Sequence, residues 1–164
     1  MEYLRIIEFP SIQRSFFIFG PRLTGKTYLL KQRYPQARYY DLLRSETFLR
    51  LSQRPSILRE EVSLLDEGQI VIIDEIQKLP QLLDEVHGLI EDRHIRFILT
   101  GSSARKLRRG GVNLLGGRAR ILRLHPLVSK EIGTFDLERF LQYGGLPSIY
   151  LSQEPWQDLQ SYCG

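Results

Sequence analysis

The sequence predicts an α/β domain in which helices cover both faces of a mainly parallel sheet. Short apolar runs that suit buried strands alternate along the chain with longer segments whose apolar residues recur at helical spacing. A glycine-containing loop joins the first apolar run to the first helical segment, and polar residues directly follow later runs. In such a fold, the loops after the strands meet along one edge of the sheet.

The predicted elements follow one another in a regular order. Four segments are expected to be strands: 16–19, 37–41, 70–73 and 96–100. The run at 70–73 is apolar at every position, which suits a central strand covered on both faces. Three segments are expected to be helical: 26–33, 42–65 and a stretch that starts near Pro80. The second of these helices should break near Pro55, because proline disrupts a helix interior.

The loop between the first strand and the first helix carries the strongest functional signal. Residues 20–27, Gly-Pro-Arg-Leu-Thr-Gly-Lys-Thr, match the pattern G-x-x-x-x-G-K-[ST] of phosphate-binding loops. Backbone N–H groups of such a loop attract phosphate oxygens, and Gly20 and Gly25 let the backbone approach them closely. Lys26 is expected to contact the β- and γ-phosphates, and the hydroxyl of Thr27 to ligate Mg²⁺. The sequence therefore predicts a site for ATP or ADP with Mg²⁺.

The residues expected to contact the nucleotide lie in this loop, at the start of the helix and after a later strand. Ligands of parallel sheets bind beyond the carboxyl ends of the strands, which is where all of these residues are predicted to lie. They are Gly20, Pro21, Arg22, Leu23, Thr24, Gly25, Lys26, Thr27, Tyr28 and Ser102.

Two acids directly follow the apolar run at 70–73. Asp74 and Glu75 form the strand-then-acid pattern of a Walker B element. Asp74 is expected to hold Mg²⁺ opposite Thr27, and Glu75 to orient the water that attacks the γ-phosphate. Alone, an Asp-Glu pair after a strand fits an ordinary turn or helix cap equally well. The glycine loop upstream favours the catalytic interpretation.

Hydroxyl side chains end the next predicted strand. If that strand lies between the first strand and the Asp74 strand, Thr100 and Ser102 would lie near the γ-phosphate or the attacking water, as polar sensors. The stretch 100–103, Thr-Gly-Ser-Ser, also suits the cap of a helix that begins at Ala104. The two roles are compatible, and both stay open on the sequence alone.

Arg118 follows two glycines and is the first candidate for an arginine that stabilises charge on the transferred phosphoryl group. Such an arginine acts within its own chain or from a neighbouring subunit, so a homo-oligomer is one possible partner arrangement. The alternative is an ordinary surface arginine in a salt bridge. Together, the residues expected to take part in catalysis are Glu75, Lys26, Arg118 and Thr100.

Charge is distributed unevenly along the chain. Residues 60–92 hold ten acids and one base, whereas residues 93–130 hold ten bases and no acid. The basic segment 93–130 is either a solvated polar surface or a surface for a protein or nucleic-acid client. Length and composition fit about one globular domain.

Composition also bears on location. No run of about eighteen apolar residues is present, and the N-terminal residues lack the apolar core of a signal peptide, so we expect no membrane association. The single cysteine, Cys163, cannot form an internal disulfide, which fits a reducing compartment. The expected location is the cytoplasm.

Six motifs in this order resemble the prokaryotic AAA-type P-loop ATPases that carry a second domain of unknown function after the ATPase core. The motifs are 20–27, 73–77, 99–103, 117–118, 126–131 and 143–147. The resemblance implies a three-layer P-loop NTPase core of the additional-strand class, with a five-stranded parallel sheet. It implies ATP and Mg²⁺ as ligands, with Lys26, Thr27, Asp74 and Glu75 at the binding and hydrolysis positions.

The resemblance also implies a division of the chain. Residues 1–133 would form the ATPase core, and residues 134–164 the truncated start of a second, mostly helical domain. Apolar residues around 135–143 and 156–162 suit two short helices in that part. Their aromatic side chains are either exposed or folded back on the core.

The predicted function is an ATP-binding protein that hydrolyses ATP with Mg²⁺ and couples its nucleotide state to a conformational or assembly change. One alternative is a small-molecule kinase of the same fold. Another is a nucleotide-gated, non-catalytic module that binds DNA or protein through residues 93–130. The acids at 74–75 favour water activation over the kinase.

Overall fold

The computed structural model describes residues 4–10, 14–109, 115–117 and 119–164. Its strands are β1 (Phe16–Phe19), β2 (Arg38–Asp41), β3 (Ile70–Asp74), β4 (Arg96–Gly101) and β5 (Arg120–Arg123). Its α-helices are α1 (Lys26–Arg33), α2 (Ser45–Gln53), α3 (Ser56–Val62), α4 (Leu82–Arg93), α5 (Ala104–Arg109), α6 (Leu137–Tyr143), α7 (Pro147–Tyr150) and α8 (Pro155–Cys163). Short 3₁₀ turns are η1 (Ile76–Lys78), η2 (Leu115–Gly117) and η3 (Ser129–Glu131).

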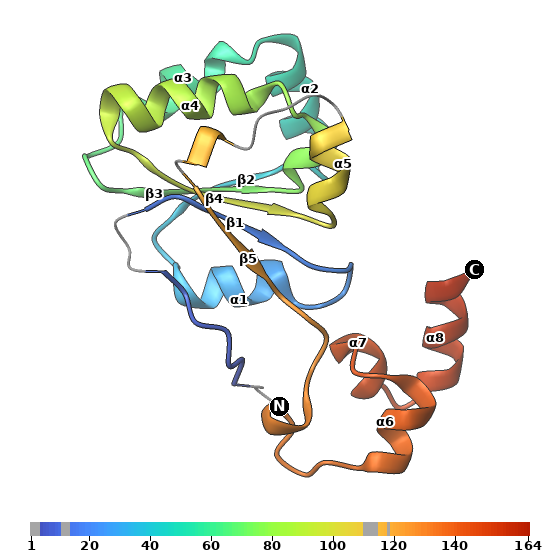
Figure 1. The fold of residues 1–164 in the computed structure, drawn as a ribbon. Helices are drawn as coiled ribbons and strands as arrows, with labels where there is room; N and C mark the ends of the chain where they lie inside the picture. The colour runs from blue at the N-terminus through green and yellow to red at the C-terminus, as the bar shows by residue number, and fades with distance from the viewer. Residues whose placement is uncertain (1–3, 11–13, 110–114, 118) are drawn as a thin grey trace.

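The five strands form one parallel sheet in the order β2-β3-β4-β1-β5. Figure 1 shows α1 on one face of the sheet and α2, α3 and α4 on the other, which gives three layers. Strand β4 lies between β1 and β3, so one strand separates the strand before the glycine loop from the strand that ends at Asp74. The predicted α/β fold of the additional-strand class is therefore confirmed.

Alternation along the central strands explains why their sequences are apolar throughout. On β1, Phe17 and Phe19 pack into the core beneath α2 to α4, while Phe16 and Ile18 pack with Leu30 of α1 on the opposite face. Successive side chains of a strand point to opposite faces, so a strand covered on both sides must be apolar at every position. The continuous runs in β3 and β4 have the same cause.

Helix boundaries agree with the proline signals to within two residues. The predicted helical segment 42–65 is two helices, since α2 ends at Gln53 and α3 begins at Ser56, on either side of Pro55. Helix α4 begins at Leu82 rather than at Pro80, which lies in the turn before it.

The sequence analysis did not locate the strand β5, although the family resemblance implied a fifth strand. It pairs with β1 at the edge of the sheet, and its residues are half-exposed or exposed. Its sequence, Arg-Ile-Leu-Arg, has charged ends and only two apolar positions, and unlike β1 and β3 it contains no run of four apolar residues. Its place in the sheet comes from pairing with β1, a tertiary contact.

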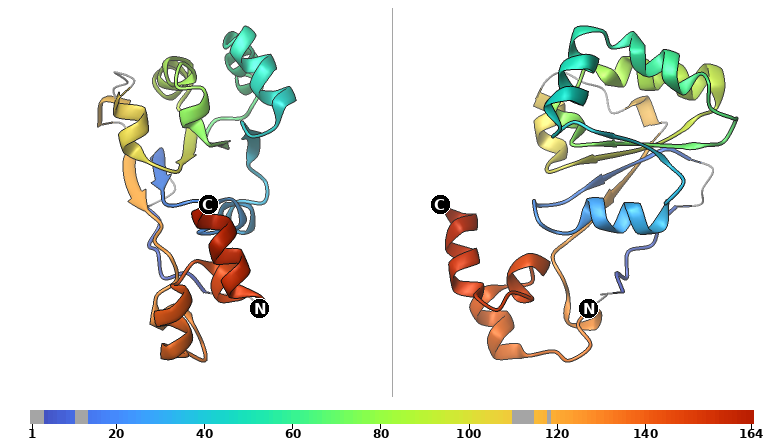
Figure 2. Two further views of the ribbon diagram at one scale, coloured as in Figure 1. Left: turned by 90° about the vertical axis from the view of Figure 1, so that its right-hand side faces the viewer. Right: turned by 180° about the vertical axis from the view of Figure 1, so that it is seen from behind.

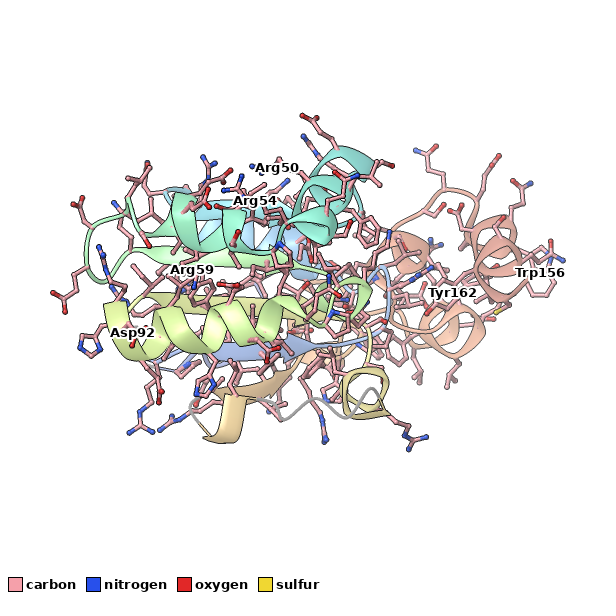
Figure 3. All side chains as sticks on the ribbon, turned by 90° about the horizontal axis from the view of Figure 1, so that it is seen from above. Arg50, Arg54, Arg59, Asp92, Trp156 and Tyr162 are labelled. Atoms are coloured by element: carbon pink, nitrogen blue, oxygen red, sulfur yellow. The ribbon has the colours of Figure 1, made fainter. Side chains whose placement is uncertain are left out.

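Ion pairs connect the helices of the outer layer. Arg50 pairs with Glu61 and Arg54 with Glu60, while Arg59 lies 3.6 Å from the carboxylate of Glu85 on α4. Figure 3 shows the three arginines along the outer surface of this layer. Part of the acidic segment 60–92 is thereby neutralised within the molecule.

Helices α6, α7 and α8 follow the sheet and lie on the same side of it as α1 (Figure 2). Helices α6 and α8 agree with the two predicted apolar segments, and α7 between them was not predicted. Phe140 of α6 packs against the cluster of Leu127, Ile132 and Tyr150, whereas Trp156 and Tyr162 of α8, labelled in Figure 3, are exposed. Both anticipated outcomes for the aromatic residues therefore occur, and the division at residues 133 and 134 stays a prediction.

Phe17 offers a direct test of the core. Its side chain is fully buried, so Phe17→Ala should lower the free energy of unfolding by about 3–5 kcal/mol through lost burial and a cavity. Urea unfolding measures the change, with Leu141→Ala, at a position 77% exposed, as a control that should shift it by less than about 0.5 kcal/mol. Equal effects of the two substitutions would contradict this packing.

Candidate nucleotide-binding site

The loop between β1 and α1 folds tightly at the carboxyl edge of the sheet (Figure 1). The Gly20 N–H donates to the carbonyl of Gly101, at 3.2 Å, which fixes the start of the loop on β4. A Cβ at Gly20 would lie 2.1 Å from the carbonyl oxygen of Leu124, so only glycine fits there. Gly25 has φ +85° and Leu23 has φ 64°, both in the left-handed region. The loop thus has the curled backbone that lets amide groups converge on an anion.

Lys26 lies across this loop and is almost fully buried. Its Nζ donates to the carbonyl oxygens of Gly20, at 2.8 Å, and Pro21, at 2.9 Å. Burial lowers the pKa of the Lys26 ammonium, and the charges of Glu75 and Asp74 partly offset this effect. A polyphosphate in the loop would supply close negative charge and favour the charged lysine, because an opposite charge nearby stabilises an ammonium.

The carboxylate of Asp74 joins four elements at the end of β3. It accepts hydrogen bonds from Thr27 Oγ1 on α1, at 2.6 Å, from the Tyr39 hydroxyl on β2 and from Thr100 Oγ1 on β4. Asp74 is only 2% exposed. Burial and the bond to Asp74 raise the pKa of the Tyr39 hydroxyl far above its usual range, so this residue remains a donor.

The donors around Asp74 fit a magnesium ion. Mg²⁺ prefers oxygen ligands and keeps several of its waters, so one hydroxyl and one carboxylate are a sufficient protein contribution. Thr27 Oγ1 and an Asp74 oxygen lie beside each other at the start of the helix that follows the glycine loop. Within the part of the chain that the structure describes, no group of three or more His, Cys, Asp or Glu side chains could hold a metal. A magnesium ion shared with a nucleotide needs no such group.

Glu75 is held beside Asp74 in an uncommon backbone conformation. Its φ of 60° is left-handed, and its N–H donates to Thr100 Oγ1 at 3.0 Å. Its carboxylate accepts a hydrogen bond from Gln77 Nε2, which also lies 3.4 Å from Ser102 Oγ. Strained residues of this kind concentrate at functional sites, where surrounding contacts hold them in place.

The structure brings most of the predicted residues together. Lys26, Thr27, Asp74, Glu75 and Thr100 lie at one edge of the sheet, as predicted, although their roles in binding and catalysis stay predictions. Thr100 bonds to the two acids, while Ser103, rather than Thr100, accepts from the Arg105 N–H at the start of α5.

The remaining predicted residues differ in burial and in contacts. In the loop, Thr24 is buried and donates to the Pro21 carbonyl, at 2.9 Å, whereas Leu23 is exposed. Tyr28 is 58% exposed on α1, with its hydroxyl bonded to Gln32. Arg118, the predicted catalytic arginine, lies outside the described residues.

The sequence analysis assigned no role to two residues of the site, Tyr39 and Gln77. Tyr39 and Tyr40 are adjacent in β2, and nothing in the sequence shows which of them faces Asp74; Tyr39 does, while Tyr40 bonds to Glu61 on the other face. Gln77 carried a usable signal, because it lies only two residues beyond Glu75 in a short turn.

A comparison with known families agrees with this geometry. A family model described as an AAA domain matches residues 13–133, which is most of the chain. The chain belongs to the AAA-type P-loop ATPase family. A search of curated proteins finds no significant match. Among the described residues of this AAA protein, no helix is both long enough and apolar enough to cross a bilayer.

The close fit at Gly20 gives a stability test with an internal control. Gly20→Ala forces a methyl group against the Leu124 carbonyl and should cost about 1–3 kcal/mol or more, as overpacking does. Gly88, inside α4, has no atom within 4 Å of an added Cβ, so Gly88→Ala should gain about 1 kcal/mol from helix propensity. Thermal unfolding of both variants compares them, and a Gly20→Ala protein as stable as the parent would contradict the loop geometry.

Proposed function

We propose that this AAA protein binds ATP with Mg²⁺ and hydrolyses it, and that the nucleotide state changes the arrangement of its C-terminal helices. Membership of the family supports a nucleotide-binding, ATPase-type function. The observation that carries the finer proposal is the Asp74 carboxylate, which joins the helix after the glycine loop to the strands on which the candidate catalytic groups lie.

The proposal gives each residue a distinct part. Backbone N–H groups of residues 20–27 and the Lys26 ammonium bind the phosphates, while Thr27 and Asp74 hold Mg²⁺, which supplies charge neutralisation when bound. Phosphoryl transfer needs little covalent help from a protein, so positioning and charge account for most of the catalysis. When a nucleotide binds, the Lys26 ammonium would exchange its hydrogen bonds to the loop carbonyls for contacts with the phosphates.

Glu75 favours hydrolysis over transfer to another substrate. It is 8% exposed, adjacent to Asp74, and bonded through its carboxylate to Gln77. A carboxylate beside the metal-holding acid is placed to orient a water and accept its proton. Thr100 bonds to both the Asp74 side chain and the Glu75 backbone, and so fixes the positions of the two acids relative to β4.

Coupling to the C-terminal helices is supported by a cavity of about 450 Å³ beside the loop. Arg22 and Leu23 of the glycine loop form one wall, and residues of α7 and α8, including Ile149 and Tyr162, form the other. A loop that changes its contacts on binding phosphate would alter this wall directly.

The nucleic-acid alternative receives less support. Four of the described bases of segment 93–130 lie at opposite ends of the parallel sheet. Arg96 and Arg120 begin β4 and β5, whereas Arg105 and Arg123 lie at or beyond the ends of these strands. Bases at opposite ends of a sheet do not form one groove for a phosphate backbone.

Two substitutions separate binding from hydrolysis. Lys26→Ala removes the buried ammonium and should weaken ATP binding by at least about 30-fold, the equivalent of about 2 kcal/mol. Glu75→Gln keeps the shape of the side chain and should retain ATP affinity while lowering turnover by about 10²–10⁴-fold. Calorimetry with Mg-ATP and a phosphate-release assay measure the two properties.

Matched controls are exposed residues of the same types. Lys130→Ala and Glu138→Gln should leave both affinity and turnover unchanged. Unaltered turnover in Glu75→Gln would refute its role in activating water, and unaltered affinity in Lys26→Ala would refute binding at the glycine loop.

A further inference from the structure

A buried arginine from the N-terminal segment reaches the glycine loop. Figure 1 and Figure 2 show the N-terminal segment running beside the chain that leaves β5. The Arg5 side chain is 9% exposed and donates to three separate parts of the molecule. Its Nη1 donates to the Thr24 carbonyl, at 2.9 Å, its Nη2 to the His125 carbonyl, and its Nε to Glu131 Oε1, at 3.0 Å.

Glu131, the acid that pairs with Arg5, also has several hydrogen-bond partners. Glu131 is 3% exposed in its side chain and accepts from Arg5, from the Ile6 N–H at 2.9 Å and from the Val128 N–H at 3.2 Å. A buried ion pair adds little net stability over an apolar pair of the same shape, so its directional bonds, rather than its energy, bear on function here. The groups that these bonds join belong to the N-terminal segment, the glycine loop and the segment around η3.

The bond to Thr24 sets the direction of a phosphate-binding donor. The Thr24 carbonyl and the Gly25 N–H belong to one planar trans peptide, so they point in opposite directions. With its carbonyl held by Arg5, this peptide must direct the Gly25 N–H away from Arg5. The charged guanidinium also polarises the peptide, which strengthens the N–H as a donor.

The segment around Glu131 continues the connection to the C-terminal helices. The Leu127 N–H donates to the Gly145 carbonyl, at 2.6 Å, just before α7. Leu127 and Ile132 pack with Tyr150 of α7 in a separate small core. Movement of the Thr24–Gly25 peptide is therefore linked to α7 through two charged side chains and one apolar cluster.

We propose that Arg5 is a positioning residue for the nucleotide site, and that the Arg5–Glu131 pair transmits the state of the glycine loop to α7. Arg5 orients the Thr24–Gly25 peptide so that its N–H faces the bound phosphate. Glu131 holds Arg5 and the η3 segment in one arrangement. The inference rests on the proposed binding of nucleotide at residues 20–27.

Affinity measurements test the positioning role. Arg5→Gln should weaken binding of Mg-ATP, and of inorganic pyrophosphate, by about tenfold or more, because a charge-assisted hydrogen bond orients one of the phosphate donors. Arg5→Lys should recover part of this loss, since one ammonium cannot reproduce the three-way contact of a planar guanidinium. Arg14→Gln, a change at an exposed N-terminal arginine, is the matched control and should bind like the parent.

Hydrogen exchange tests the connection to α7. In the parent, Mg-ATP should change amide exchange in residues 147–151 as well as in the glycine loop. Glu131→Gln leaves the Thr24 and His125 carbonyls as acceptors for Arg5, so it should hold ATP affinity within about threefold, yet lose the ATP-dependent change in α7. If Arg5→Gln does not fold, Arg5→Lys and Glu131→Gln still decide the two parts of the proposal.

The outcomes separate this inference from the proposed function. A parent that binds no ATP refutes the proposed function. A parent that binds ATP while Arg5→Gln and Arg5→Lys bind equally well refutes the positioning role of Arg5. An unchanged ATP-dependent exchange of α7 in Glu131→Gln refutes the transmission.

Discussion

The hydrogen bonds of one buried carboxylate hold the functional edge of this molecule together. Asp74 ends a central strand and accepts hydroxyl groups from α1, β2 and β4. A buried carboxylate without such donors would be costly, so the positions of Thr27, Tyr39 and Thr100 are fixed by the need to satisfy it. These bonds connect α1, which follows the glycine loop, to the end of β3, and so set the shape of the candidate site.

Two charged groups in the site are restrained by bonds that a ligand can replace. Lys26 donates to carbonyl oxygens of its own loop, and Glu75 accepts from Gln77. Each group is buried, and under the proposed function each lies beside the bound phosphates or the attacking water. This arrangement avoids an unpaired buried charge in the free protein while keeping both groups beside the site.

What the sequence predicted well depends on local patterns. The glycine loop is contiguous, and Asp74 follows an apolar run whose length and composition mark it as a central strand, so both were found without knowledge of the sheet. The five-stranded parallel architecture was expected from a resemblance, and it is observed. The position of β4 between β1 and β3 is what brings Thr100 to Asp74.

What the sequence did not reveal depends on contacts between distant residues. The edge strand β5 carries no continuous apolar run, and it is defined by pairing with β1. The contacts of Arg5, on which its proposed role rests, join residues 19 to 126 positions apart in the chain. Such contacts leave no periodic pattern or short motif, because the partners are fixed only when the whole fold is formed.

The central claim is that the glycine loop, Lys26, Thr27 and Asp74 together bind a nucleotide through its phosphates and a magnesium ion. The most direct measurement is a calorimetric titration of the parent protein with ATP, in Mg²⁺ and again in EDTA. The account predicts saturable binding at one site per chain that is clearly tighter with Mg²⁺. Absence of saturable binding at millimolar ATP in Mg²⁺, or an affinity that does not change when Mg²⁺ is removed, would contradict it.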